Sequence, residues 1–216
     1  MPRRKGASLT RIDVIEAALV CIQKDGEAGL GINRVARELG IQPPSLYNHV
    51  SSQEDLRQAV AMEGWRRLLA LLVNQIGPLE ETAGRRLEQE HSWTTVHQMA
   101  HLYRRFAHDY PSLYGVMAGT IFSPNHPEFS TLLQHSLQYY AECLYPLGLT
   151  AEQIPHAAKF LWAAVHGFVC LERSHWTTYP ARDTVTDMDQ SFEWLLATFH
   201  QAILSSLPPA LSSERA

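Results

Sequence analysis

Residues 42–49 contain the side chains whose types best suit a chemical task. Ser45, Tyr47, Asn48 and His49 are short or planar hydrogen-bonding residues with almost no formal charge. Such groups suit the edges of base pairs at the bottom of a DNA groove, where donors and acceptors are matched individually. The residue types therefore indicate sequence reading on DNA, provided that the chain presents them on one exposed face.

Two short helices joined by a tight turn would position these side chains. The buried face of the first helix is predicted by apolar residues at helical spacing, which are Ile32, Val35, Ala36 and Leu39. Gly40 supplies the backbone freedom that ends this helix, and Pro43 and Pro44 suit the first turn of a second helix. Leu46 and Val50 would form its inward side. The spacing therefore predicts a helix-turn-helix.

The sequence of this region resembles a known family. The stretch LGINRVARELGIQPPSLYNHVSSQEDL, residues 30–56, is similar to the DNA-binding segment of the TetR family of bacterial transcriptional regulators. Its most specific part is Gly40, an apolar residue, Pro44 and then the run SLYNHV. The resemblance implies an all-α fold. In that fold an N-terminal three-helix helix-turn-helix domain precedes a larger C-terminal helical bundle that binds a ligand and dimerises.

The resemblance also implies which residues meet bases and phosphates, namely Gln42, Pro43, Pro44, Tyr47 and His49, and we add Ser45 and Asn48 from the same face. The Tyr47 ring can pack on a thymine methyl group or a sugar and give its hydroxyl to a phosphate. His49 suits a backbone phosphate better than a base. In the alternative interpretation, Tyr47 and His49 only shield the small core.

Three positions depart from the family pattern. The family usually has Ser or Thr where this chain has Gly31, Arg where it has Asn33 and Lys where it has Gln53. Losing Arg and Lys removes two charge-assisted contacts to DNA. Asn33 could instead read adenine through its amide, and we expect Gln53 to remain at the DNA. The DNA sequence recognised therefore does not transfer from any relative.

The net charge of −4 is unevenly distributed. Residues 1–50 contain seven Lys and Arg against five Asp and Glu, whereas residues 51–216 contain eleven against seventeen. Arg3, Arg4 and Lys5 form a basic tip that could follow the DNA backbone or enter a minor groove, or could be a solvated terminus. The small excess predicts affinity that depends on a dimer and on a few positioned contacts.

Helical patterns continue along the whole chain. Ser8 or Thr10 could cap a first helix through residue 25, with an inner stripe of Ile12, Ile15, Ala18, Leu19 and Ile22. Residues 51–54, SSQE, predict a Ser-capped start for a connecting helix over residues 52–76. Further helices are predicted from the low 80s to 109, then over 112–118, 128–147, 150–176 and 188–206. We assign residues 1–51 to the DNA-binding domain and 79–216 to the effector-binding and dimerisation domain.

The second domain contains FLWAAVHGFVCLE, in which Trp162 and His166 lie one turn apart and Gly167 would allow a neighbouring backbone to approach closely. This resembles a Trp-His-Gly pattern in the effector-binding half of a TetR subgroup. The aromatic side chains of this domain would form an apolar surface on which Tyr hydroxyls and His imidazoles are the polar groups. Such a surface suits an apolar or aromatic ligand that carries one or two polar groups. The candidate ligand-binding residues are Trp93, His97, Tyr103, Phe106, Tyr110, Tyr114, Met117, Tyr139, Trp162 and His166. Core or dimer-interface roles are the alternative.

Dimerisation is expected of the last two long helices, which in the family pair into a four-helix bundle. Apolar faces at the right period are supplied by Trp162, Phe168, Leu171, Phe192, Leu195, Leu196 and Phe199. A two-fold dimer would place two recognition helices roughly 34–36 Å apart on a near-palindromic DNA site. A ligand in the second domain would alter that spacing through the 52–76 helix.

Other chemistry has weaker support in the sequence. His97 and His101 have the i, i+4 spacing of two metal ligands, but no third ligand is evident, so we expect no metal and no cofactor. Nucleophile, triad and phosphate-loop motifs are absent, so we do not expect an enzyme. The three cysteines Cys21, Cys143 and Cys170 suit a reduced cytoplasm, and no apolar run reaches the ~18 residues of a membrane span.

The sequence thus predicts a cytoplasmic, homodimeric repressor of the TetR type that a small molecule releases from double-stranded DNA. One alternative is a DNA-binding regulator without an effector. A third possibility is a metal-dependent enzyme built on His97 and His101.

Overall fold

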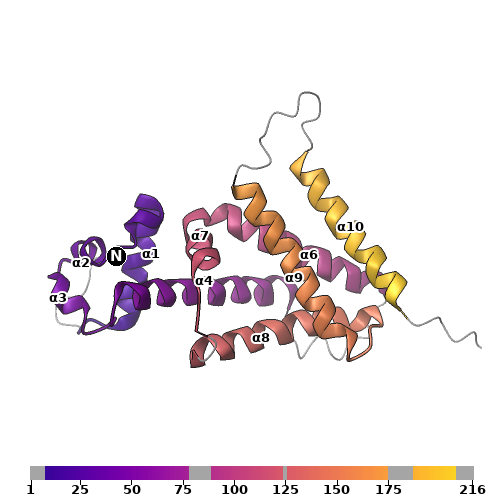
Figure 1. Ribbon diagram of the computed structural model, residues 1–216, viewed down its shortest axis with the longest axis horizontal. Helices are drawn as coiled ribbons and strands as arrows, with labels where there is room; N and C mark the ends of the chain where they lie inside the picture. The colour runs from indigo at the N-terminus through magenta and orange to yellow at the C-terminus, as the bar shows by residue number, and fades with distance from the viewer. Residues whose placement is uncertain (1–7, 78–88, 124–125, 175–186, 208–216) are drawn as a thin grey trace, which may run out of the picture. The chain divides into compact units, whose positions relative to one another are not determined.

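The computed structural model describes residues 8–77, 89–123, 126–174 and 187–207. Within these residues every regular element is a helix and none is a strand (Figure 1), which confirms the all-α expectation. The chain forms two compact units, Met1–Ala70 with Arg105–Leu132 and Leu71–Arg104 with Leu133–Ala216. These units do not coincide with the domains assigned from the sequence, 1–51 and 79–216, which stay a prediction.

Helix α1 (Arg11–Asp25) begins the first unit. Thr10 caps it, because its hydroxyl accepts the Asp13 N–H while the Asp13 carboxylate accepts the Thr10 N–H. The buried residues of α1 are Val14, Ala17, Ala18, Leu19, Cys21 and Ile22. The inward position predicted for Ile12 is wrong, since its side chain is 71% exposed. Ile12 lies about 200° around the helix from Val14 and so points away from the packed face.

The helix-turn-helix follows the short 3-10 helix η1 (Gly26–Gly29) and consists of α2 (Ile32–Leu39) and α3 (Pro43–Leu46). Gly40 has φ 68° and ψ 31°, the left-handed conformation that glycine adopts at least cost. The Ile41 N–H then donates to the Ala36 carbonyl at 3.0 Å, which completes a Schellman-type helix end. Leu46 and Val50 are buried as predicted.

The second helix of the motif is shorter than its sequence pattern predicts. Only one turn is α-helical, and the chain then continues as a turn in which the N–H groups of His49 and Val50 both donate to the Leu46 carbonyl. Tyr47, Asn48 and His49 therefore lie on a tight turn at the end of α3.

The remaining helices that the structure describes are α4 (Gln53–Ile76), α6 (Gln89–Asp109), α7 (Pro111–Gly119), α8 (Pro127–Leu144), η2 (Tyr145–Leu147), α9 (Gln153–Arg173) and α10 (Met188–Ser206). In the first unit, the Ser52 hydroxyl accepts the Asp55 N–H at the start of α4, as predicted. A Cβ added to Gly64 of α4 would lie 2.5 Å from the Met117 sulfur of α7, so glycine permits this close approach.

In the second unit α9 and α10 run antiparallel beside one another (Figure 1), and Gln153 at the start of α9 donates to the Ser206 carbonyl at the end of α10. Phe192, Leu196 and Phe199 of α10 are buried within the single chain. The dimer surface expected of these three residues is therefore wrong. They pack inward, and other apolar residues of α9 and α10 face outward.

Helix α9 corrects two further expectations. It is long and apolar enough, by length and composition, to cross a membrane, with a mean hydropathy of 1.3, although the sequence was expected to contain no such segment. A core or interface helix of a water-soluble protein meets the same criterion. In addition, a Cβ added to Gly167 would meet no atom of the described residues within 4 Å. The close approach expected at Gly167 is therefore not made by any segment that the structure describes.

Candidate DNA-binding site

The turn and α3 present the predicted recognition residues to solvent. Tyr47 is 53% exposed, although it lies between the buried residues Leu46 and Val50. Because Tyr47 is so exposed, shielding of the core is not its main role. Of the other residues predicted in this segment, Gln42, Pro44, Ser45 and Asn48 are exposed and Pro43 and His49 are half-buried. Arg3, Arg4 and Lys5 lie outside the described residues.

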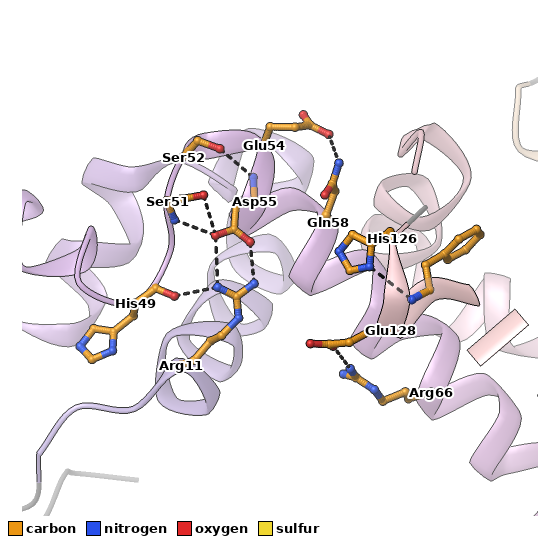
Figure 2. Close-up of polar contacts among 11 residues, drawn as sticks. Arg11, His49, Ser51, Ser52, Glu54, Asp55, Gln58, Arg66, His126 and Glu128 are labelled. Atoms are coloured by element: carbon orange, nitrogen blue, oxygen red, sulfur yellow. Dashed lines mark hydrogen bonds and ion pairs between the residues drawn. The ribbon is translucent and has the colours of Figure 1, made fainter. Parts of the chain in front are cut away.

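Arg11 of α1 holds the end of the recognition segment in place. One guanidinium nitrogen donates to the His49 carbonyl at 2.7 Å, and another lies 2.5 Å from an Asp55 oxygen (Figure 2). The same carboxylate accepts the Ser51 N–H at 2.7 Å and the Ser51 hydroxyl at 3.0 Å. Figure 2 shows that the His49 imidazole points away from this cluster. Three elements of the first unit therefore meet at one ion pair, which leaves the His49 ring available.

The electrostatics of this cluster favour the charged forms of both partners. The pKa of Asp55 is lowered to about 2, mainly by the Arg11 hydrogen bonds, whose effect exceeds the opposing effect of partial burial, and the Ser51 hydrogen bonds act in the same direction as Arg11. Asp55 conversely raises the pKa of Arg11. The pair is therefore fully ionised at neutral pH.

Gln53 compensates for the missing cap at Gly31. Gly31 precedes α2 and has no side chain with which to cap it. The Ile32 N–H instead donates to the Gln53 side-chain oxygen at 3.1 Å, and the Gln53 amide nitrogen donates to the Leu30 carbonyl. The Gln53 amide thus satisfies a backbone donor that the helix start would otherwise leave unpaired. The DNA contact expected of Gln53 stays a prediction, and it would require release of this bridge.

Most cations of this region are already paired with acids. The ion pairs among residues 8–70 include Arg34 with Asp25 and Glu38, Lys24 with Glu38, Arg57 with Glu27, Arg66 with Glu63, and Arg67 with Glu16 and Glu63. Among these described residues only Arg37 is a cation without an ion pair, and it is exposed. Arg37 was not among the residues predicted from the sequence to contact DNA. The available signal was its position four residues after Asn33, which is also exposed and shares its helix face.

The second unit brings together Tyr103, Trp162 and His166, three of the candidate ligand-binding residues. The Tyr103 hydroxyl and His166 Nδ1 are hydrogen-bonded at 2.8 Å, and the Trp162 ring stacks on the His166 ring with centroids 5.4 Å apart. The other ring nitrogen of His166 lies 3.6 Å from the Cys170 sulfur. Burial lowers the pKa of His166. These contacts describe a neutral imidazole held by its neighbours.

The other predicted ligand-binding residues are dispersed. Phe106, Tyr110, Tyr114 and Met117 belong to the first unit, and Tyr110 is 52% exposed while the other three are buried. In the second unit the Tyr139 hydroxyl donates to the Leu72 and Gly77 carbonyls, both at 3.1 Å. Trp93 stacks on His200 at 4.0 Å, and His97 lies 2.7 Å from Glu193. The predicted set is therefore not one cluster within either unit.

Comparisons with known proteins agree with this architecture. The family model "Bacterial regulatory proteins, tetR family" matches residues 14–60, and "Tetracyclin repressor-like, C-terminal domain" matches residues 96–199. An uncharacterized HTH-type transcriptional regulator of Mycobacterium tuberculosis is 36% identical over 166 residues, which cover 77% of this chain and 71% of that protein. The two sequences therefore align through most of both chains.

Solved structures share the fold. The crystal structure of BioQ with its double-stranded DNA operator has a TM-score of 0.61 and 19% identity, and the match covers 92% of this chain and 99% of BioQ. A TetR variant from Acinetobacter baumannii in complex with minocycline has a TM-score of 0.60 and 22% identity, covering 93% and 97% of the two chains. At these identities the likeness concerns the fold alone.

The Arg11–Asp55 ion pair yields a stability prediction. Asp55→Asn should lower the free energy of unfolding at pH 7 by about 1–2 kcal/mol, because charged hydrogen bonds are lost at a partly solvated site. The folded-state pKa of about 2 lies below the ordinary value of 3.8, so the carboxylate's stabilisation is complete above roughly pH 4 and is lost as the pH falls through 2. Urea unfolding at several pH values measures the difference.

Glu54→Gln is the matched control, since Glu54 is exposed on the neighbouring position and bonds only within its own helix to Gln58. Its effect should stay within about 0.5 kcal/mol. If Asp55→Asn lowered the free energy of unfolding equally at pH 7 and at pH 2, the ionised Asp55 carboxylate could not be the group that stabilises the fold.

Proposed function

Because this chain belongs to the TetR family of bacterial transcriptional regulators, we propose that it represses transcription and that a small apolar or aromatic molecule releases it from DNA. TetR-family proteins bind DNA operators as dimers and are transcriptional regulators rather than enzymes. They act on DNA in the cytoplasm, and we propose this location here. The observation that supports DNA reading most strongly is the exposed, uncharged face of residues 42–48 on a segment held by Arg11.

The chemistry of each side chain indicates which residues would contact bases and which would contact phosphates. Tyr47, Asn48 and Ser45 offer neutral donors, acceptors and a ring to base edges, while the His49 imidazole and Arg37 lie where they can meet phosphates. Asn33, on the same face of α2 as Arg37, suits a further base or phosphate contact. Since Arg37 is the unpaired cation of residues 8–70, non-specific affinity should be low and should require two copies of the module.

We assign the dimer interface to the outward apolar residues of α9 and α10. Side chains that are large, apolar and exposed in the single chain are Phe160 at 56%, Trp162 at 36%, Leu171 at 55%, Trp194 at 72% and Leu204 at 46%. Exposed aromatic side chains on two adjacent antiparallel helices favour burial against a second copy, as in a four-helix bundle. The open space over Gly167 suits the approach of a partner helix.

The effector proposal rests on the Trp162–His166–Tyr103 group of the second unit. It combines a wide apolar ring with a hydroxyl and an imidazole, which suits a ligand with an aromatic body and a polar group. The minocycline complex of the Acinetobacter protein is one case of such a ligand in a structural neighbour. The near-complete burial of Tyr103 and Tyr139 favours the alternative, a regulator whose core is filled and that takes no effector.

Tyr47→Ala and Arg37→Ala should distinguish sequence-specific contacts from electrostatic attraction to the DNA backbone. On a duplex selected from random DNA, Tyr47→Ala should reduce affinity to the level of non-specific DNA, because the ring and hydroxyl contacts to the site are lost. Arg37→Ala should weaken binding to the selected duplex and to non-specific DNA alike. It should also reduce the slope of log affinity against log salt concentration by about 0.9 per chain, because one phosphate contact is lost. Fluorescence anisotropy over a salt series measures both effects. Sedimentation should show unchanged dimers, and an unchanged affinity of Tyr47→Ala for the selected site would refute the assignment.

Trp194→Glu should convert the dimer to monomers, because a charge would replace the most exposed aromatic of α10 at the proposed interface. Ile12→Glu provides the matched control, since Ile12 is equally exposed, at 71%, but lies on α1. Sedimentation velocity distinguishes the two species. A dimer that persists with Trp194→Glu, or one that dissociates with Ile12→Glu, would show that the interface lies elsewhere.

A screen of aromatic compounds that carry one polar group tests whether a ligand releases the protein from DNA. A ligand present at 100 times its Kd should raise the native-state stability by about 2.7 kcal/mol and lower the affinity for the selected duplex. His166→Ala, which alters the proposed effector group without removing a residue assigned to the dimer interface, should abolish the shift, and Tyr145→Ala should retain it, because Tyr145 is an exposed aromatic outside the Trp162 group. A compound that binds and leaves the DNA affinity unchanged would count against effector control.

A further inference from the structure

Three potential metal ligands meet between α6 and α10. His97 and His101 lie one turn apart on α6, and Glu193 reaches them from α10, 96 residues after His97. His97 Nε2 lies 2.7 Å from one Glu193 oxygen, and His101 Nε2 lies 2.8 Å from the other. The ligand atoms all lie within 4.8 Å of one another. The third ligand that the sequence did not reveal is therefore Glu193.

A simple ion pair does not account fully for this arrangement. The Nε2 atom of His101 is buried and makes no hydrogen bond among the described residues, although a carboxylate oxygen lies 2.8 Å away. The two atoms are thus close without the alignment that a shared proton requires. A cation between them would satisfy both, because imidazole nitrogen and carboxylate oxygen are each electron-pair donors.

We propose that His97, His101 and Glu193 form a binding site for a divalent transition metal, with Zn²⁺ as the best match. Two imidazoles and one carboxylate form a common zinc ligand set, which leaves the fourth tetrahedral position for water. Tetrahedral ligation at about 2.0–2.1 Å places ligand atoms roughly 3.3 Å apart. The nitrogen–oxygen separations would need to open by about half an ångström, which side-chain rotation can supply on this partly exposed surface.

The charges around the site suit a cation. Arg104 is the nearby positive group, but it lies 2.6 Å from Glu172 and 2.7 Å from Asp189, so two carboxylates compensate its charge. Together with Glu193, the neighbourhood has a negative balance. A bound ion would join α6 to α10, the helix that we assign to the dimer interface. The inference does not depend on the proposed effector, since the ligands form the site without the Trp162 group.

Zinc titration of the chelator-treated full-length dimer tests the site. Calorimetry and elemental analysis after dialysis should give one zinc ion per chain with the wild-type protein. Glu193→Gln and His101→Gln should each weaken zinc binding by about 100-fold or more, since losing a residue that only orients a metal ligand already costs about 10–100-fold. His156→Gln, which removes an exposed histidine of α9, should leave the affinity unchanged.

The Glu193→Gln variant preserves side-chain shape, and circular dichroism together with binding to the selected duplex would verify that each variant is folded. Zinc should also raise the thermal midpoint of the wild-type protein and not that of Glu193→Gln. Absent zinc binding would overturn the proposal. Equal binding by wild type, Glu193→Gln and His101→Gln would also overturn it, because the zinc would then be on other histidines. Neither result would alter the DNA-binding assignment, which rests on other residues.

Discussion

The proposed DNA-binding site depends on one ion pair in the first unit. Arg11 bonds both Asp55 and the His49 carbonyl, so a single guanidinium connects α1, the turn after α3 and the start of α4. This constraint matters because α3 has only one helical turn, and so short a helix has little stability of its own. The recognition residues are held by tertiary contacts on both sides of the turn. Leu46 and Val50 anchor it from within, and Arg11 anchors it at the end.

Few cationic side chains of residues 8–70 are left without an ion pair, so little positive charge is available for DNA. Among residues 8–70, most arginines and Lys24 pair with acids on other helices. What remains for DNA among residues 8–70 is a neutral face and Arg37. Affinity must then come from positioned contacts repeated in two subunits, and specificity is expected to exceed non-specific attraction. The exposed aromatics of α9 and α10 provide a physical reason for the second subunit.

The sequence was sufficient where local chemistry decides the structure. A cap at Ser8 or Thr10, of which the structure has Thr10, the Gly40 turn and the helix Met188–Ser206 all follow from signals within a few residues. It was insufficient where packing between distant segments decides. The rotation of α1 that exposes Ile12, the inward face of Phe192 and Phe199, and the Gln53 bridge to α2 depend on contacts made far along the chain. Glu193 beside His97 is the clearest case, because no local spacing connects them.

The most direct test of the account is amide hydrogen exchange of the dimer, measured with a selected operator duplex and with an unrelated duplex of the same length. We predict that the operator slows exchange most in residues 42–50 and the adjoining end of α2, and that the unrelated duplex slows it much less there. Equal protection by both duplexes in this segment, or operator-specific protection located elsewhere, would contradict the claim that the Arg11-held turn reads the DNA.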